Sequence, residues 1–163
     1  MSTQPQPSPA LFFETANAFQ RTAALKAAVE LNLFTAIGKG SITAAEVGRK
    51  IGAPERSTRI LCDFLTVIGF LVKQDGRYAS TPDSARFLDR SSPAYLGNAL
   101  RFLLSPVVAA SYADLAETVR RGATILEEQG TVTPDNPLWV DFARGMAPLM
   151  MMPAQMIADL LRF

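Results

Sequence analysis

The C-terminal part of the chain carries side chains whose chemistry suits contact with a flat, apolar molecule. Five methionines lie close together there: Met146, Met150, Met151, Met152 and Met156. Thioether side chains adapt to the shape of a neighbour and contact aromatic rings well. Phe142 precedes Met146 by four residues, so both side chains face the same way on a helix. The same pattern is typical of a flexible core or of an interface, and the residues alone leave these interpretations open.

Residues suited to catalysis are scarce in this sequence. Histidine is absent, so no side chain has an ordinary pKa near neutral pH. Cys62 is the only cysteine, which excludes an internal disulfide and a Cys/His metal site. Glu127 and Glu128 are adjacent, and adjacent side chains point in different directions on a helix. No glycine-rich loop follows a predicted strand. These residues do not support an independent enzyme.

The composition predicts a globular protein and argues against a nucleic-acid-binding one. Hydrophobic residues make up 48% of the 163 residues, which is too many for a disordered chain. The net charge is +1, whereas nucleic-acid-binding domains are usually strongly basic. No apolar run approaches the ~20 residues of a membrane span, and no signal peptide is visible. We therefore expect a cytoplasmic protein without a membrane segment.

The N-terminal region is predicted to be one long helix after a flexible tail. Residues 1–9 are too polar and proline-rich to build a core. Residues 10–37 have helical periodicity, and Gly38 ends the pattern. Apolar residues run most of the way round this helix, so we expect burial on more than one side. A partner chain could cover the second side.

Residues 43–88 are predicted to follow the order helix, helix, hairpin, helix. Thr43 and Glu46 form a capping box that opens a helix, and Gly52 closes it. Pro54 fits the first turn of the next helix. The apolar face of that helix is formed by Ile60, Leu61, Phe64, Leu65 and Ile68.

The hairpin turn is predicted at Asp75-Gly76, between strands over residues 70–72 and 77–79. A further helix starts at Thr81-Pro82 and reaches Leu88. This order is typical of a winged helix-turn-helix. A DNA-binding version would present several basic or amide side chains on its second helix. Here the second helix and wing mix basic with acidic residues: Arg56, Arg59, Asp63, Lys73, Asp75 and Arg77.

The remainder of the chain is predicted to be helical. Residues 93–121 carry an apolar face that Pro106 should interrupt, and Gly122 ends the segment. A loop over residues 123–136 precedes a last helix that Pro148 and Pro153 should bend. The predicted fold is therefore mainly α: a winged helix-turn-helix with a small β-hairpin wing, plus additional bridging helices. The predicted divisions are a tail (1–9), a winged-helix domain (10–92) and bridging helices (93–163).

The ordered set of segments resembles a known family. The segments are ALKAAVELNLFTAI, TAAEVGRKIG, RILCDFLTVIGFL and DGRYASTPDSARFL, followed by SYADLAETVRRG and NPLWVDFARGM. In this order they resemble the N-terminal dimerisation domain and bridging helices of S-adenosylmethionine-dependent O-methyltransferases of the caffeate and hydroxyindole type. The resemblance covers residues 12–161. It implies a homodimer with intertwined N-terminal helices, in which one subunit can line the pocket of the other.

The resemblance also implies which residues contact the substrate, often an aromatic or polyketide-like hydroxyl compound. Phe142 and Met146 match the pocket-lining aromatic and methionine positions, and Leu138 matches a further pocket position. Leu149 falls where plant members often have a histidine. Phe102 and Leu103 match a substrate-contacting pair on the preceding helix.

The cofactor-binding part of the family pattern lies beyond the position that matches Phe163. This part comprises the glycine-rich loop, the acidic ribose-binding residue and the catalytic histidine. The resemblance therefore implies that a Rossmann-like domain is missing, and that these residues alone bind no S-adenosylmethionine and catalyse no transfer. The alternatives are a winged-helix DNA-binding transcriptional regulator and a free-standing dimerisation module.

Overall fold

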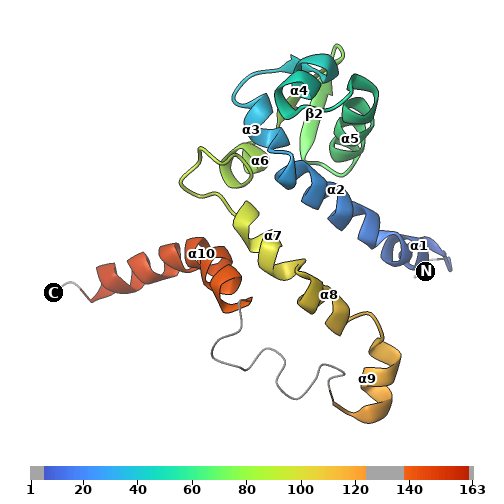
Figure 1. Cartoon of the computed structure of the whole chain (residues 1–163), viewed down its shortest axis with the longest axis vertical. Coiled ribbons are helices and arrows are strands. Elements are labelled where there is room, and N and C mark those ends of the chain that lie inside the picture. Colours follow the sequence, from blue (N-terminus) through green and yellow to red (C-terminus); the bar gives the residue numbers. More distant parts are fainter. Residues whose placement is uncertain (1–5, 124–137, 162–163) are drawn as a thin grey trace, which may run out of the picture. The chain divides into compact units, whose positions relative to one another are not determined.

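The computed structural model describes residues 6–123 and 138–161, without the side chains of Leu138 and Met152. The chain divides into two compact units, residues 1–85 and 86–163 (Figure 1). The fold is mainly α-helical with a small antiparallel sheet, as the sequence predicts. None of the described helices has the length and apolar character needed to cross a membrane.

The N-terminal region forms three helices where the sequence predicts one: α1 (Ala10–Ala16), α2 (Ala18–Glu30) and α3 (Leu33–Ile37). The first break is at Asn17, which ends α1. The second is at Asn32, whose φ of 56° is left-handed, a conformation that asparagine tolerates better than most residues. The apolar periodicity continues across both breaks, so periodicity alone could not show them.

The winged-helix motif begins at α4 (Ala44–Ile51), and the predicted capping box is confirmed. The Glu46 backbone N–H donates to Thr43 Oγ1 at 3.2 Å, and the Thr43 backbone N–H donates to Glu46 Oε2 at 2.7 Å. Gly52 ends α4 with a φ of 70°, as expected for a glycine after a helix.

Helix α5 (Glu55–Val67) packs closely against α4. A Cβ at Gly48 would lie 2.6 Å from the Ala53 carbonyl oxygen, so only glycine fits there. Pro54 precedes α5 as its N-cap, one position before the predicted first turn. The fully buried positions of α5 share only Leu65 with the predicted face, and Ile60 of that face is 53% exposed. They are Thr58, Cys62 and Leu65.

The predicted wing is confirmed as strands β2 (Leu71–Gln74) and β3 (Arg77–Ser80). Asp75 and Gly76 both have positive φ, as a two-residue hairpin turn requires. The sequence analysis missed the short strand β1 (Ile42–Thr43), which pairs antiparallel with β3 through Ile42 and Tyr78. The sheet order is β1-β3-β2. Helix α6 (Pro82–Phe87) follows, and Thr81 Oγ1 accepts from the Ser84 backbone N–H.

The predicted helical segment 93–121 is divided into three shorter helices. Pro106 interrupts the segment as expected, with a second break at residues 112–114. The helices are α7 (Gly97–Leu103), α8 (Pro106–Ser111), α9 (Leu115–Arg121) and α10 (Leu138–Leu160). Gly122 ends α9. Pro148 and Pro153, which are expected to bend the last helix, both lie inside α10. The Glu127-Glu128 pair and nearly all of the predicted loop lie outside the described residues.

Candidate functional site

Helices α7 and α10 cross closely at Gly145. Gly145 is buried, and a Cβ there would lie 2.9 Å from Ala99 Cα and 3.2 Å from the Asn98 carbonyl oxygen. These are backbone atoms that cannot rotate away. The absence of a side chain therefore allows the two backbones to approach. An ion pair with 3.9 Å between Arg101 Nε and Asp141 Oδ1 also connects the two helices.

Three aromatic rings cluster beside this crossing. The Phe102 and Phe142 rings meet edge to face, with centroids 5.1 Å apart and planes at 75°. Trp139 meets Phe142 in the same manner at 5.7 Å and 88°. These separations and angles are typical of favourable aromatic pairs. Phe142 and Trp139 keep 37% and 43% of their surface exposed, so the cluster could contact a further apolar molecule.

The structure brings together only some of the predicted substrate-contacting residues. Phe102 and Phe142 are in direct contact, and Met146 is half-buried one turn after Phe142. Leu103 is 51% exposed, so it is not part of a closed core. Leu138 begins α10, but its side chain lies outside the described residues. The role of each residue remains a prediction.

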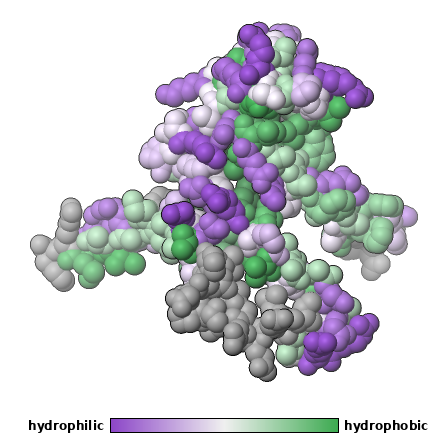
Figure 2. Space-filling view, viewed as in Figure 1, coloured by the Kyte–Doolittle hydropathy of each residue, from purple (hydrophilic) through white to green (hydrophobic). Residues whose placement is uncertain are grey.

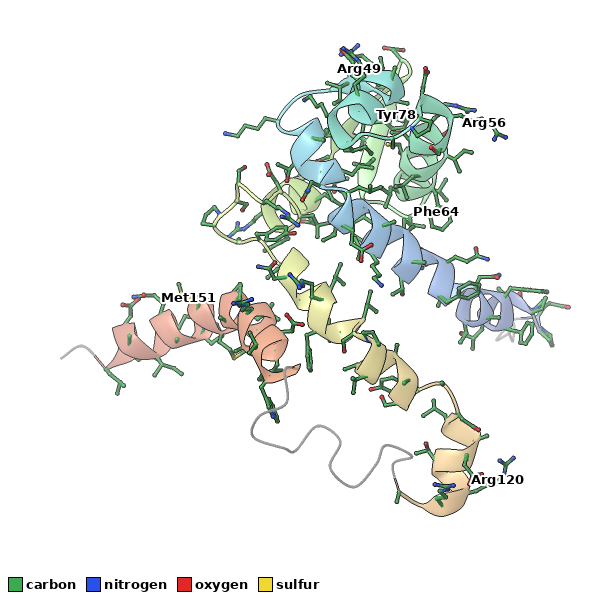
Figure 3. All side chains as sticks on the ribbon, in the orientation of Figure 1. Arg49, Arg56, Phe64, Tyr78, Arg120 and Met151 are labelled. Carbon is green, nitrogen blue, oxygen red and sulfur yellow. The ribbon has the colours of Figure 1, made fainter. Side chains whose placement is uncertain are left out.

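Leu149 lines a different concave surface, of about 400 Å³, within residues 86–163. Neither Phe142 nor Met146 lines it. The wall is mostly apolar, and Met151 on α10 contributes to it (Figure 3). Its full lining is Arg86, Phe87, Pro93, Ala94, Leu96, Pro148, Leu149, Met151 and Gln155. The structure therefore does not unite all the predicted α10 residues on one surface.

The sequence analysis missed Trp139 as a member of the aromatic cluster. Trp139 is three residues before Phe142, a spacing that places two side chains on the same side of a helix. This spacing was visible in NPLWVDFARGM and could have revealed the pair. Trp139 is also the only tryptophan of the chain, so its fluorescence reports on this cluster alone.

The described residues do not fit S-adenosylmethionine or a metal ion. The described strands all belong to the one small sheet, and β3 continues into α6 rather than into a glycine-rich loop. No group of three or more potential metal ligands occurs within the described ranges.

In residues 1–85, the winged helix holds a polar cluster between α5 and the wing. Asp63 Oδ1 accepts hydrogen bonds from Lys73 Nζ and from the Tyr78 hydroxyl, each at 2.6 Å. Tyr78 is buried on β3 (Figure 3). The Lys73 bond, followed by the Tyr78 bond, lowers the pKa of Asp63 below its ordinary value. Burial, followed by the bond to Asp63, raises the pKa of Tyr78.

This cluster and its neighbours neutralise basic side chains that a DNA reader would present. Arg59 Nη1 lies 3.7 Å from Asp63 Oδ2, and Lys73 donates to the same carboxylate. Arg77 donates to the Ser41 carbonyl oxygen at 2.6 Å and lies 3.5 Å from Glu46. Arg49 and Arg56 point outward (Figure 3). The internal pairing of Arg59, Lys73 and Arg77 argues against nucleic-acid recognition.

The apolar surface of the N-terminal helices is exposed, in contrast to the charged wing. Figure 2 shows hydrophobic residues on the surface of α1. Four large hydrophobic residues of α1 and α2 are at least half exposed: Leu11 (75%), Phe12 (68%), Phe13 (57%) and Phe19 (67%). Clustered large exposed apolar residues typically mark an interaction site.

A surface hollow of about 370 Å³ lies beside these helices, between α1–α2 and the end of α5. Val67, on the α5 side of the hollow, is 82% exposed. The lining residues are Phe13, Glu14, Asn17, Gln20, Arg21, Phe64, Val67 and Ile68. We call this hollow together with the exposed residues of α1–α2 the N-terminal face.

Residues 13–90 match the O-methyltransferase dimerisation domain. Two Streptomyces proteins are similar over part of their length. The 3-hydroxy-5-methyl-1-naphthoate 3-O-methyltransferase of Streptomyces sahachiroi is 32% identical over 115 residues, covering 71% of this chain and 33% of the relative. The tetracenomycin polyketide synthesis 8-O-methyl transferase TcmO of Streptomyces glaucescens is 33% identical over 117 residues, covering 69% and 33%.

Solved structures share the fold. A protein from Nostoc punctiforme, solved as a candidate O-methyltransferase, is 49% identical with a TM-score of 0.90, covering 98% of this chain and 48% of that one. Human N-acetylserotonin methyltransferase in complex with SAM has a TM-score of 0.64 at 22% identity, covering 91% and 44%. The chain thus spans about a third of the length of these curated relatives and about half of these solved structures.

Proposed function

We propose that this chain, whose residues 13–90 match the O-methyltransferase dimerisation domain, is the dimerisation and substrate-covering part of an S-adenosylmethionine-dependent methyltransferase. In this proposal the part described here supplies the subunit contact and one wall of the acceptor site. The cofactor and the transfer chemistry belong to a Rossmann-like domain that follows it. The acceptor is a small molecule with an aromatic hydroxyl group.

The observation that carries the proposal is that residues 1–85 pair charged side chains internally but leave large apolar side chains exposed. The winged helix pairs most of its basic residues internally, whereas the N-terminal face presents large apolar side chains to solvent. A surface of this kind gains free energy when a protein partner covers it. We propose a second copy of the chain as that partner, with the N-terminal faces in contact.

The acceptor wall is proposed on the α7–α10 pair. Phe102, Phe142 and Met146 combine ring edges with an adaptable thioether, which suits a flat aromatic molecule. The names of the Streptomyces relatives mention a hydroxynaphthoate and a polyketide. We extend that class of acceptor, fused-ring phenols of polyketide type, to this chain as part of the proposal.

The division of labour is tested by calorimetry with S-adenosylmethionine. Residues 1–163 alone should show no saturable binding at micromolar concentration, because the described residues contain no cradle for the cofactor. The complete methyltransferase that carries this segment should bind the cofactor. Saturable micromolar binding by residues 1–163 would contradict the proposed division.

The acceptor wall is tested by Met146→Ala in the complete methyltransferase. Loss of the thioether should raise the KM for a hydroxynaphthoate acceptor or lower its turnover, with the KM for S-adenosylmethionine nearly unchanged. If Met146 only fills a core, the melting temperature should fall while the folded enzyme keeps normal kinetics. That outcome would remove Met146 and Phe142 from the proposed wall.

A further inference from the structure

We infer that Gly145 is a positioning residue, which sets the separation of α7 and α10 and thereby holds Phe142 against Phe102 in the acceptor wall. The functional half of this inference rests on the proposed function, because it assumes that the wall contacts the acceptor. The structural half rests on the helix crossing alone.

The first step is that the crossing tolerates no side chain on α10. An added Cβ would meet Ala99 Cα at 2.9 Å and the Asn98 carbonyl oxygen at 3.2 Å. Contacts below 3.0 Å between such atoms are essentially absent from real structures. Because both contacts are to the α7 backbone, a methyl group at position 145 must push one helix away from the other.

The second step is that the aromatic contact depends on this separation. Phe142 lies one turn before Gly145, and its ring meets Phe102 of α7 at 5.1 Å. Met146 directly follows Gly145 and is half-buried. A shift of α10 at Gly145 would therefore move both proposed wall residues relative to Phe102, although Gly145 touches no acceptor itself.

The third step is that the ion pair between the two helices holds their separation only weakly. The Arg101–Asp141 ion pair is 3.9 Å long, and the side chain of Arg101 is 71% exposed. Exposed ion pairs of this kind contribute little and hold geometry weakly. The backbone contact at Gly145 is thus the stronger constraint on where Phe142 lies.

The test is Gly145→Ala, examined in two ways. In the complete methyltransferase, the KM for a hydroxynaphthoate acceptor should rise at least tenfold, while the KM for S-adenosylmethionine changes less than twofold. In residues 1–163, the emission of Trp139 should change in the folded state, because its ring contacts Phe142 at 5.7 Å. Alanine favours the helical conformation more than glycine does. A lower helix propensity therefore cannot explain the raised acceptor KM or the changed Trp139 emission.

The matched control is Ala147→Ser, which adds one atom at an exposed position two residues along the same helix. It should leave both readouts at their wild-type values. If Gly145→Ala does not fold, Ala99→Ser enlarges the buried residue on the α7 side of the same crossing. It should shift the same two readouts in the same direction, by a smaller amount.

The outcomes separate this inference from the proposed function. A lower melting temperature with unchanged Trp139 emission and unchanged acceptor KM would mean that Gly145 serves stability only, and would overturn the inference. A changed Trp139 emission in residues 1–163, together with a complete protein that methylates no aromatic acceptor, would support the positioning role and defeat the proposed function.

Discussion

Residues 1–85 and residues 86–163 use apolar side chains in different ways. The first unit buries a continuous core that includes Leu33, Phe34, Leu65, Leu71 and Tyr78, each at most 2% exposed. In the second unit, the described buried positions are the small residues Gly97, Ala99, Ser105 and Gly145. Its large apolar residues are mostly exposed, and Figure 2 shows hydrophobic surface along α10.

The difference indicates that the two units are complete to different degrees. A winged helix with a closed core and an internally paired wing can fold by itself. A helix pair that meets through small residues, and keeps its large ones outside, leaves those large side chains available for contact with further protein surface. This contrast fits a chain in which the first unit organises the subunit and the second joins it to more structure.

The sharpest way to break this comparison is to truncate one leucine in each unit. Leu65→Ala removes a side chain that is 0% exposed and should cost about 2–5 kcal/mol of unfolding free energy. Leu103→Ala removes one that is 51% exposed and should cost less than about 1 kcal/mol. Urea unfolding at a single protein concentration measures both. Equal losses would show that the second unit also has a closed core.

The next largest effect is expected at the N-terminal face. Replacing Phe12 and Phe19 by Ser together should raise the dimer dissociation constant at least about 30-fold, or about 2 kcal/mol, because both rings would be covered in the dimer. Val119→Ser, at a residue that is 78% exposed in the other unit, is the control and should leave association unchanged. Sedimentation equilibrium measures both variants. A wild-type chain that stays monomeric at tens of micromolar would contradict the proposed dimer.

The first unit is also where the sequence predicted most of the structure. The Thr43–Glu46 capping box and the Asp75-Gly76 turn were predictable because each depends on local chemistry within a few residues. The breaks at Asn17 and Asn32 were not, since the apolar stripe continues through them. Strand β1 has only two residues and exists through its pairing with Tyr78, a contact distant in sequence.

The candidate site was predicted less completely, for the same physical reason. The contact between Phe102 and Phe142 joins two helices, and its geometry depends on the close approach at Gly145. The family resemblance grouped Leu149 with Phe142 in one pocket, but in the structure Leu149 lines a separate hollow that Phe142 does not line. Residue spacing identifies the faces of single helices, whereas the partner of each face is set by tertiary packing.

A smaller effect is expected from Asp63→Asn in the wing cluster. The substitution removes the negative charge of the carboxylate that accepts hydrogen bonds from Lys73 and Tyr78. It should lower the free energy of unfolding by about 1 kcal/mol, since the Asp63 side chain is 36% exposed and its charge is partly screened. The pKa of Asp63 is lowered in the folded state, so its contribution is complete above the ordinary carboxyl pKa. That contribution is lost as the pH falls through the folded pKa.

The stability difference between wild type and Asp63→Asn should therefore be constant from pH 7 to 5 and shrink below about pH 4. Comparison of the two proteins at each pH cancels the titration of other groups, such as Glu46, whose pKa is also lowered, mainly by its bond from the Thr43 backbone. Urea unfolding across this range measures the difference. A difference that grows as the pH falls would show that the carboxylate destabilises the fold.

The smallest perturbation compares thiols in the two units. Cys62 is 0% exposed, and burial raises its pKa to about 11, so at pH 8 the native thiol is neutral and covered. Its reaction with a disulfide reagent should be at least about 100-fold slower than that of an ordinary exposed thiol, and should become fast in urea.

Ala147→Cys adds a second thiol on the exposed side of α10. In this variant one thiol per chain should react at the ordinary rate, and the other should react only on unfolding. If both react slowly, α10 is covered in solution, for example in the dimer, and the contrast between the two units would apply only to the isolated subunit.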